Sequence, residues 1–204
     1  MGPTPVPAGR RVHVRGADGT RLHTEVFGPE DGYPIVLAHG ITCSLQVWRE
    51  QIADLSRDYR VIAFDHRGHG RSSVPPRSQY TLDHLAADVD AVLDATVKPG
   101  EKAVLAGHSM GGIAIGAWSH HFREKVHQRV DGVALINTTT GDIIRQVKFL
   151  MLPSVFSAGR NAIGSLIVRR FGGIPTVPAA AGPSRRFVAA LAVGRDADPE
   201  VASF

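Results

Sequence analysis

Four short runs of consecutive apolar residues most constrain how this chain can fold. Such runs are typical of strands that are buried on both faces of a parallel sheet. The segments between them repeat apolar residues every three or four positions, as one buried face of a helix requires. This alternation predicts a doubly wound α/β fold, with a mostly parallel sheet and helices on both faces. The expected strands lie at residues 35–38, 61–64, 103–106 and 133–136, and the expected helices at 47–55, 82–93 and 113–122.

Polar and apolar residues alternate ahead of the first run, between residues 11 and 28. The dipeptide Asp18-Gly19 divides this stretch into two segments, and Asp-Gly in such a place favours a hairpin turn. An antiparallel hairpin is therefore expected to open the sheet. Residues 1–10 contain Pro3, Pro5 and Pro7 and are expected to form a disordered lead-in.

The alternation of strands and helices stops after Thr140. Two stretches with helical spacing follow, at 142–151 and 162–171, and glycine and proline residues separate them. We therefore expect an α/β core over residues 11–140. Residues 141–204 are expected to form a partial helical cap, or lid, that follows the sixth strand.

The composition excludes several classes of protein. The 204 residues carry a formal net charge of +4 without a long basic run, so no nucleic-acid partner is expected. A single cysteine excludes an internal disulfide and is compatible with a reducing compartment. The N-terminus has no apolar core of a signal peptide, and no apolar stretch is long enough for a transmembrane segment. These absences favour a cytoplasmic location.

A nucleophile motif follows the expected strand 103–106. The residues Gly107-His108-Ser109-Met110-Gly111 fit the G-x-S-x-G pattern, between a buried strand and a helix. A sharp turn in this context exposes the serine side chain above the sheet, and Gly107 and Gly111 permit close backbone contacts. Ser109 is therefore the candidate catalytic nucleophile, at a helix N-terminus that favours developing negative charge.

Two further motifs follow the expected strands 35–38 and 61–64. The first is His39-Gly40-Ile41, and the second is Asp65-His66-Arg67-Gly68-His69-Gly70-Arg71-Ser72. With the serine motif, their order and spacing resemble those of the α/β-hydrolase superfamily over roughly residues 10–140. The glycines of the second motif satisfy neither common nucleotide-binding pattern.

The resemblance implies a serine hydrolase of the esterase, lipase or cofactor-free haloperoxidase type. It implies that the backbone N–H groups of Ile41 and Met110 form the oxyanion hole, while His39 shapes its loop. The motif residues Gly40, His108, Asp65, Gly68 and Gly70 support the elbow and the loops. No cofactor or metal is expected, because the pairs His66/His69 and His120/His121 fit structural or solvated roles better than metal ligation.

The expected substrate is a small hydrophobic ester or a related acyl compound. Perhydrolysis, C–C bond hydrolysis and thioester hydrolysis remain open, because they use the same elbow. Serine at the elbow argues against haloalkane dehalogenases and typical epoxide hydrolases, whose nucleophile is aspartate. The sequence does not identify the substrate or the oligomeric state.

The catalytic acid and histidine of the family are not expected within these 204 residues. In this fold they follow the serine along the chain, and no histidine follows His127. We expect a C-terminally truncated hydrolase without the family's last two strands, whose strand 133–136 is an exposed edge able to pair with another chain. The alternative is an inactive remnant that binds a small hydrophobic ligand or a partner subunit.

Overall fold

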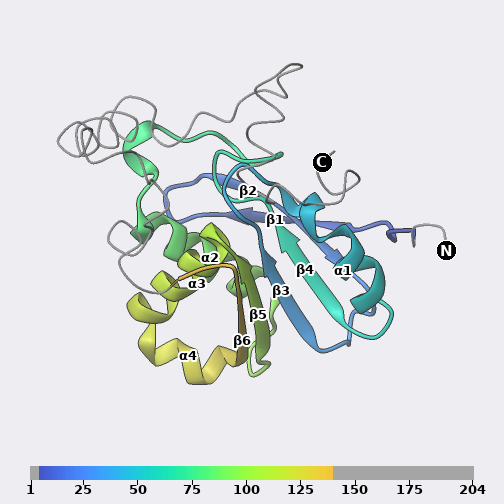
Figure 1. Ribbon diagram of the computed structural model, residues 1–204. Coiled ribbons are helices and arrows are strands. Elements are labelled where there is room, and N and C mark those ends of the chain that lie inside the picture. The colour runs from blue at the N-terminus through green and yellow to red at the C-terminus, as the bar shows by residue number, and fades with distance from the viewer. Residues whose placement is uncertain (1–4, 140–204) are drawn as a thin grey trace, which may run out of the picture. The chain divides into compact units, whose positions relative to one another are not determined.

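The computed structural model describes residues 5–139, which form a six-stranded mixed sheet with helices on both faces (Figure 1). The strands lie in the order β1-β2-β4-β3-β5-β6 across the sheet. β1 and β2 form an antiparallel hairpin, and β2 also runs antiparallel to β4. The remaining pairs are parallel. The strands are β1 (Arg10–Arg15), β2 (Arg21–Phe27), β3 (Pro34–Ala38), β4 (Arg60–Phe64), β5 (Ala103–His108) and β6 (Val130–Ile136).

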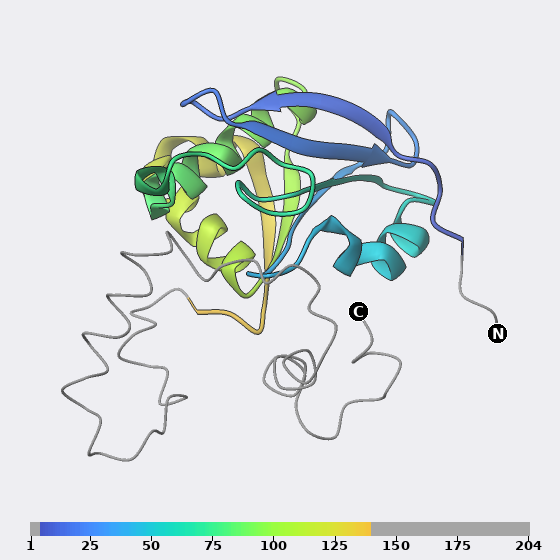
Figure 2. The ribbon, with the colours of Figure 1, turned by 90° about the horizontal axis from the view of Figure 1, so that it is seen from above.

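The helices divide between the two faces of the sheet (Figure 2). α1 (Arg49–Leu55) lies on one face, while α2 (Leu82–Thr96) and α3 (Met110–His121) pack together on the other. α4 (Arg123–Arg129) leads from α3 into β6. Two short 3-10 helices, η1 (Leu45–Trp48) and η2 (Arg77–Gln79), precede α1 and α2.

Alternate residues of the central strands supply two separate cores. On β4, Ile62 and Phe64 join the core under α2 and α3, whereas Val61 and Ala63 join the core under α1. Each of these four side chains is fully buried. A continuous apolar run is needed here because successive side chains of a strand point to opposite faces.

The expected hairpin and parallel strands are confirmed, and Thr81 caps α2 by accepting a hydrogen bond from the His84 amide. The expected helix 47–55 is wrong in detail, because the chain forms η1 up to Trp48 and begins α1 at Arg49. The helix α4 was not expected. β1 begins at Arg10, one residue inside the expected lead-in.

Strand β6 differs from the other parallel strands in its exposure. The apolar run 133–136 is typical of a strand buried on both faces, but an exposed edge was expected at this strand, and Val133, Leu135 and Ile136 are 49%, 45% and 39% exposed. Within residues 5–139, β6 pairs with β5 alone, so it forms the edge of the described sheet. Two sequence expectations, the lead-in over residues 1–4 and the cap over residues 141–204, lie outside the described residues. Across residues 5–139, no helix combines the length and hydropathy that a membrane span requires.

Candidate active site

The loops that carry the sequence motifs meet where the sheet changes its winding direction. From β3 the chain crosses to β4 on one side, whereas β5 lies on the other side of β3 and leads outward to β6. In open α/β sheets, ligands bind beyond the carboxyl ends of the strands at such a switch point. Gly40 follows β3 and Ser109 follows β5, so both motifs border this crevice.

Ser109 occupies a strained turn between β5 and α3. Its φ of 50° and ψ of −116° lie in a region that residues with a side chain rarely adopt. The amide of Ser109 donates a 3.0 Å hydrogen bond to the carbonyl of Ile136, at the end of β6. Among the described residues, the Ser109 hydroxyl has no hydrogen-bond partner. The turn therefore presents a half-buried serine hydroxyl at the carboxyl edge of the sheet.

Glycines allow the backbone to close around this turn. A Cβ atom at Gly107 would lie 2.6 Å from the amide nitrogen of Gly112, and one at Gly111 would collide with the carbonyl of Ala38. A Cβ atom at Gly40 would lie 2.7 Å from Nδ1 of His108 and 3.3 Å from Cβ of Ser109. Gly40 is therefore in direct contact with the elbow, and the motifs after β3 and β5 form one site.

The chain after β3 makes a tight turn in which the Cys43 amide donates to the Gly40 carbonyl at 3.3 Å. Thr42 has a φ of 64°, a costly conformation for a β-branched residue. The hydrogen bond of this turn uses the N–H of Cys43, and the N–H of Ile41 takes no part in it. Met110 begins α3, and the first N–H groups of a helix have no acceptor within the helix.

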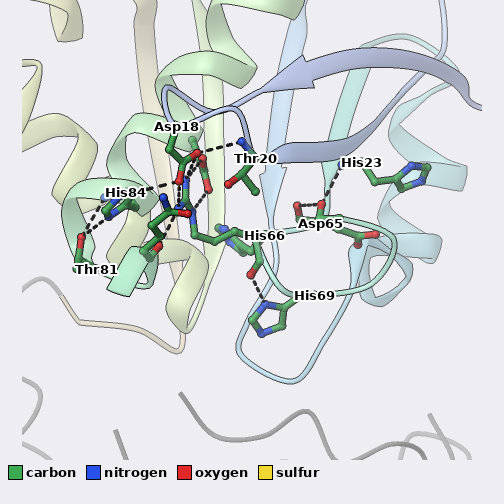
Figure 3. Close-up of polar contacts among 12 residues, drawn as sticks. Asp18, Thr20, His23, Asp65, His66, His69, Thr81 and His84 are labelled. Carbon is green, nitrogen blue, oxygen red and sulfur yellow. Dashed lines mark hydrogen bonds and ion pairs between the residues drawn. The ribbon is translucent and has the colours of Figure 1, made fainter. Parts of the chain in front are cut away.

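The loop after β4 is organised by the buried carboxylate of Asp65 (Figure 3). One carboxylate oxygen accepts from the Leu45 amide at 2.7 Å, and the other accepts from the Arg71 amide at 2.8 Å. Gly70 has a φ of 50°, and a Cβ atom there would collide with the Asp65 carboxylate. Gly68 also has a positive φ, of 72°, and packs against Tyr80. Asp65, Gly68 and Gly70 thus shape the loop and join it to η1.

His39 connects the loops after β3 and β4 and is fully buried. Its Nε2 accepts a 3.0 Å hydrogen bond from the His66 amide. The ring proton therefore lies on Nδ1, which donates to the Gly40 carbonyl at 2.7 Å. Burial lowers the pKa of His39 to about 4. A neutral ring with both nitrogens engaged holds the loop and has no free nitrogen to act as a base.

His66 lies beside His39, and the two ring centroids are 4.8 Å apart. The ring of His66 is fully buried, and neither of its nitrogens has a hydrogen-bond partner among residues 5–139. Burial holds the pKa of His66 well below its ordinary value. The ring of His69 also lies near His39, with ring centroids 5.4 Å apart, and bonds the Arg67 carbonyl through Nδ1 at 2.9 Å. Among residues 5–139, no group of three or more histidine, cysteine or acidic side chains could hold a metal ion.

The sequence analysis missed Thr138, which reaches the elbow from the segment after β6. Its hydroxyl donates a 2.6 Å hydrogen bond to the carbonyl oxygen of Ser109. The carboxyl ends of parallel strands meet at one edge of a sheet, so polar residues after the run 133–136 were a usable signal.

Comparison with known protein families agrees with this geometry. Residues 33–195 match the family model described as the alpha/beta hydrolase fold, and the chain belongs to this family. Its members in general combine the parallel sheet with a nucleophile turn such as that at Ser109.

Individual relatives carry different activities in their names. A probable oxidoreductase EphD from Mycobacterium tuberculosis is 35% identical over 130 residues, which cover 63% of this chain and 22% of that protein. A non-heme chloroperoxidase from Streptomyces lividans is 45% identical over 100 residues, which cover 48% of this chain and 35% of that protein.

A solved structure, the esterase RhEst1 from Rhodococcus sp. ECU1013, matches with a TM-score of 0.58 and 39% identity. The match covers 66% of this chain and 47% of the esterase chain. The chain therefore spans less than half the length of each of these three proteins.

Proposed function

We propose that the chain contributes the nucleophile and the oxyanion hole of a serine hydrolase that cleaves a carboxylic ester or a related acyl substrate. The strained turn at Ser109 carries this proposal. The surrounding structure stabilises an unfavourable φ and ψ, and strain of this kind is concentrated at functional sites. The resemblance to a solved esterase supports an ester as the substrate class.

In the proposed first step, the Ser109 hydroxyl oxygen attacks the ester carbonyl carbon while a base accepts its proton. The carbonyl oxygen becomes an oxyanion, which the N–H groups of Ile41 and Met110 stabilise. The ester C–O bond then breaks, and the departing alcohol takes a proton from the protonated base. The resulting acyl-serine is hydrolysed by water to the free acid and the serine hydroxyl.

The base is the component that residues 5–139 do not provide. His39 and His66 are buried in the loop, and no described histidine bonds the Ser109 hydroxyl. In a serine protease, loss of the histidine base lowers kcat by a factor of about 10⁶. The sharpest test therefore supplies the base from solution.

The test treats the folded chain with a fluorophosphonate, with and without added imidazole, and locates the adduct by peptide mass spectrometry. Attack by the Ser109 oxygen on phosphorus expels fluoride, and imidazole takes the proton. We expect an adduct on Ser109 whose formation accelerates with imidazole, and no adduct in the Ser109→Ala variant. A cooperatively unfolding chain that forms no Ser109 adduct in either condition would overturn the proposal.

The exposed apolar residues of β6 favour a second candidate, a non-catalytic protein that pairs with a partner along this edge. Val133, Leu135 and Ile136 supply its apolar surface. The same labelling experiment separates the two candidates, because edge pairing does not require a reactive serine. An unlabelled chain that forms a defined complex through β6 would support the second candidate.

A further inference from the structure

The carbonyl oxygen of Ser109 accepts hydrogen bonds from two different parts of the chain. The amides of Gly112 and Ile113 donate to it at 3.0 and 3.2 Å, as helix-start amides commonly do. The Thr138 hydroxyl adds a 2.6 Å bond from a residue 29 positions further along the chain. This bond is the shortest of the three and comes from outside the helix.

The end of β6 and the segment after it therefore bond the backbone of Ser109 at both its amide and its carbonyl. The Ile136 carbonyl accepts from the amide of Ser109, and the Thr138 hydroxyl donates to its carbonyl. Asn137, between these two partners, has a φ of 44°. Asparagine tolerates this conformation better than most residues, and the turn brings Thr138 back toward the elbow.

The missing side chain of Gly112 makes room for Thr138. A Cβ atom at Gly112 would lie 2.7 Å from the Thr138 hydroxyl oxygen and 2.8 Å from its Cβ atom. Any larger residue at position 112 would thus displace the threonine. The Thr138 side chain therefore packs closely against Gly112 at the first turn of α3.

The planarity of the peptide bond gives this contact a consequence for the oxyanion hole. The Ser109 carbonyl and the Met110 N–H belong to the same planar trans peptide and point in opposite directions. A hydrogen bond that fixes the carbonyl therefore also fixes the direction of the Met110 N–H. Without it, the carbonyl keeps the two amide bonds from α3 but loses the shortest of its three bonds, so the Ser109–Met110 peptide is held less firmly in its strained orientation.

We propose that Thr138 is a positioning residue that orients the Met110 N–H of the oxyanion hole through its hydrogen bond to the Ser109 carbonyl. This inference deepens the proposed function and rests on it for its catalytic meaning. Thr138 bonds the Ser109 carbonyl and not its hydroxyl, so its effect is transmitted through the backbone of the elbow.

The test compares Thr138→Val, which keeps the shape and removes the hydroxyl, with Thr138→Ser, which keeps the hydroxyl. Thr96→Val is the matched control, because the Thr96 hydroxyl donates an equally short bond of 2.6 Å to the Val92 carbonyl within α2. The first readout is the rate constant of imidazole-assisted phosphonylation of Ser109. The second is hydrogen–deuterium exchange of the amides from Met110 to Ile113 in the untreated protein.

We expect Thr138→Val to slow phosphonylation by about 10-fold, since a fully lost oxyanion donor costs on the order of 10²–10³ and a misdirected one less. Thr138→Ser is expected to react within about threefold of the parent, as a bond of similar strength remains. Thr96→Val is expected to react at the parent rate. A parent rate in Thr138→Val, or a rate in Thr138→Ser as low as in Thr138→Val, would overturn the inference.

Exchange separates failure of this inference from failure of the proposed function. If the parent protein forms no Ser109 adduct, the proposed function fails, but exchange still reports on the elbow. Faster exchange at Met110–Ile113 in Thr138→Val, but not in Thr138→Ser or Thr96→Val, would support the positioning role. Unchanged exchange in Thr138→Val would overturn it.

Discussion

The guanidinium of Arg67 donates two parallel hydrogen bonds, each 2.6 Å long, to the carboxylate of Asp88. Both side chains are at most 1% exposed. Arg67 also bonds Asp18 in the β1–β2 turn at 2.8 Å and the Gln79 carbonyl at 2.7 Å. One side chain thus joins the hairpin, the loop of Asp65 and helix α2.

Replacing Arg67 with Met is expected to destabilise the fold strongly. The change leaves Asp88 buried without its partner, and removing one member of a buried ion pair costs about 3–5 kcal/mol. Urea unfolding monitored by circular dichroism measures the free energy of unfolding. Arg57→Met is the control, because Arg57 and Asp54 form an exposed pair for which a loss of about 1 kcal/mol or less is expected. Equal losses in the two variants would contradict the prediction.

Replacing Ser109 with Gly is expected to stabilise the folded protein. A side chain in this backbone conformation costs about 1–3 kcal/mol, and glycine removes that cost. The greater flexibility of glycine in the unfolded chain offsets about 0.5–1 kcal/mol, so a net gain of about 1 kcal/mol is expected. Ser109→Ala retains the Cβ atom and serves as the control in the same urea experiment. A gain in Ser109→Ala as large as that in Ser109→Gly would argue that the hydroxyl, and not the backbone, is the source.

Adding a methyl group at Gly40 is expected to disturb the elbow directly. The new atom would meet His108 at 2.7 Å and Ser109 at 3.3 Å, so the loop after β3 must move. We expect a loss of about 1–3 kcal/mol in unfolding free energy and at least 10-fold slower phosphonylation of Ser109. In the control Gly132→Ala, the new Cβ would lie 3.6 Å from Val104, an ordinary contact. If both variants matched the parent, Gly40 would not be required at the site.

Stability is expected to decline in mild acid because of His39. Its pKa falls from 6.5 to about 4 in the folded state, so the unfolded state binds a proton at higher pH. The stabilisation is complete above about pH 6.5 and is lost as the pH falls toward 4, by about 3 kcal/mol in total. Burial raises the pKa of Asp18, but the hydrogen bonds from Arg67 and Thr20 and the charge of Arg67 together lower it to about 2, so Asp18 loses its contribution only at lower pH.

The measurement is the urea midpoint at several pH values between 7 and 4. His39→Gln is expected to flatten the decline, with a residual slope from His66, whose pKa burial lowers in the same direction. The exposed His127 provides the control variant His127→Gln, which should keep the parent slope. A parent slope in His39→Gln would show that other groups control the acid sensitivity.

Local sequence patterns predicted most of the sheet, because a strand that is buried on both faces requires a continuous run of apolar residues. Val36 and Leu37 are neighbours in β3 but enter different cores, which only a continuous apolar run allows. Ser109 was also predictable, since its glycines, strand and helix are adjacent in sequence. The resemblance to the α/β-hydrolase superfamily implied a supporting role for Gly40, which stays a prediction.

Contacts between distant residues were not predictable in this way. Arg67 and Asp88 are 21 positions apart, and Thr138 lies 29 positions from Ser109. Such pairs depend on how elements are arranged in space, and neither pair leaves a periodic signal. The division between η1 and α1 at Trp48 was missed because both helix types place apolar residues at similar intervals.

A backbone hydrogen bond connects Ser109 to β6, the edge strand of the described sheet. The last carbonyl of β6, that of Ile136, accepts from the Ser109 amide, and within residues 5–139 the other backbone edge of β6 has no partner strand. A strand that docked on this edge would stiffen the strand that holds the Ser109 backbone. We therefore expect Ser109 to react faster when a strand is paired with β6 and more slowly when that strand is absent.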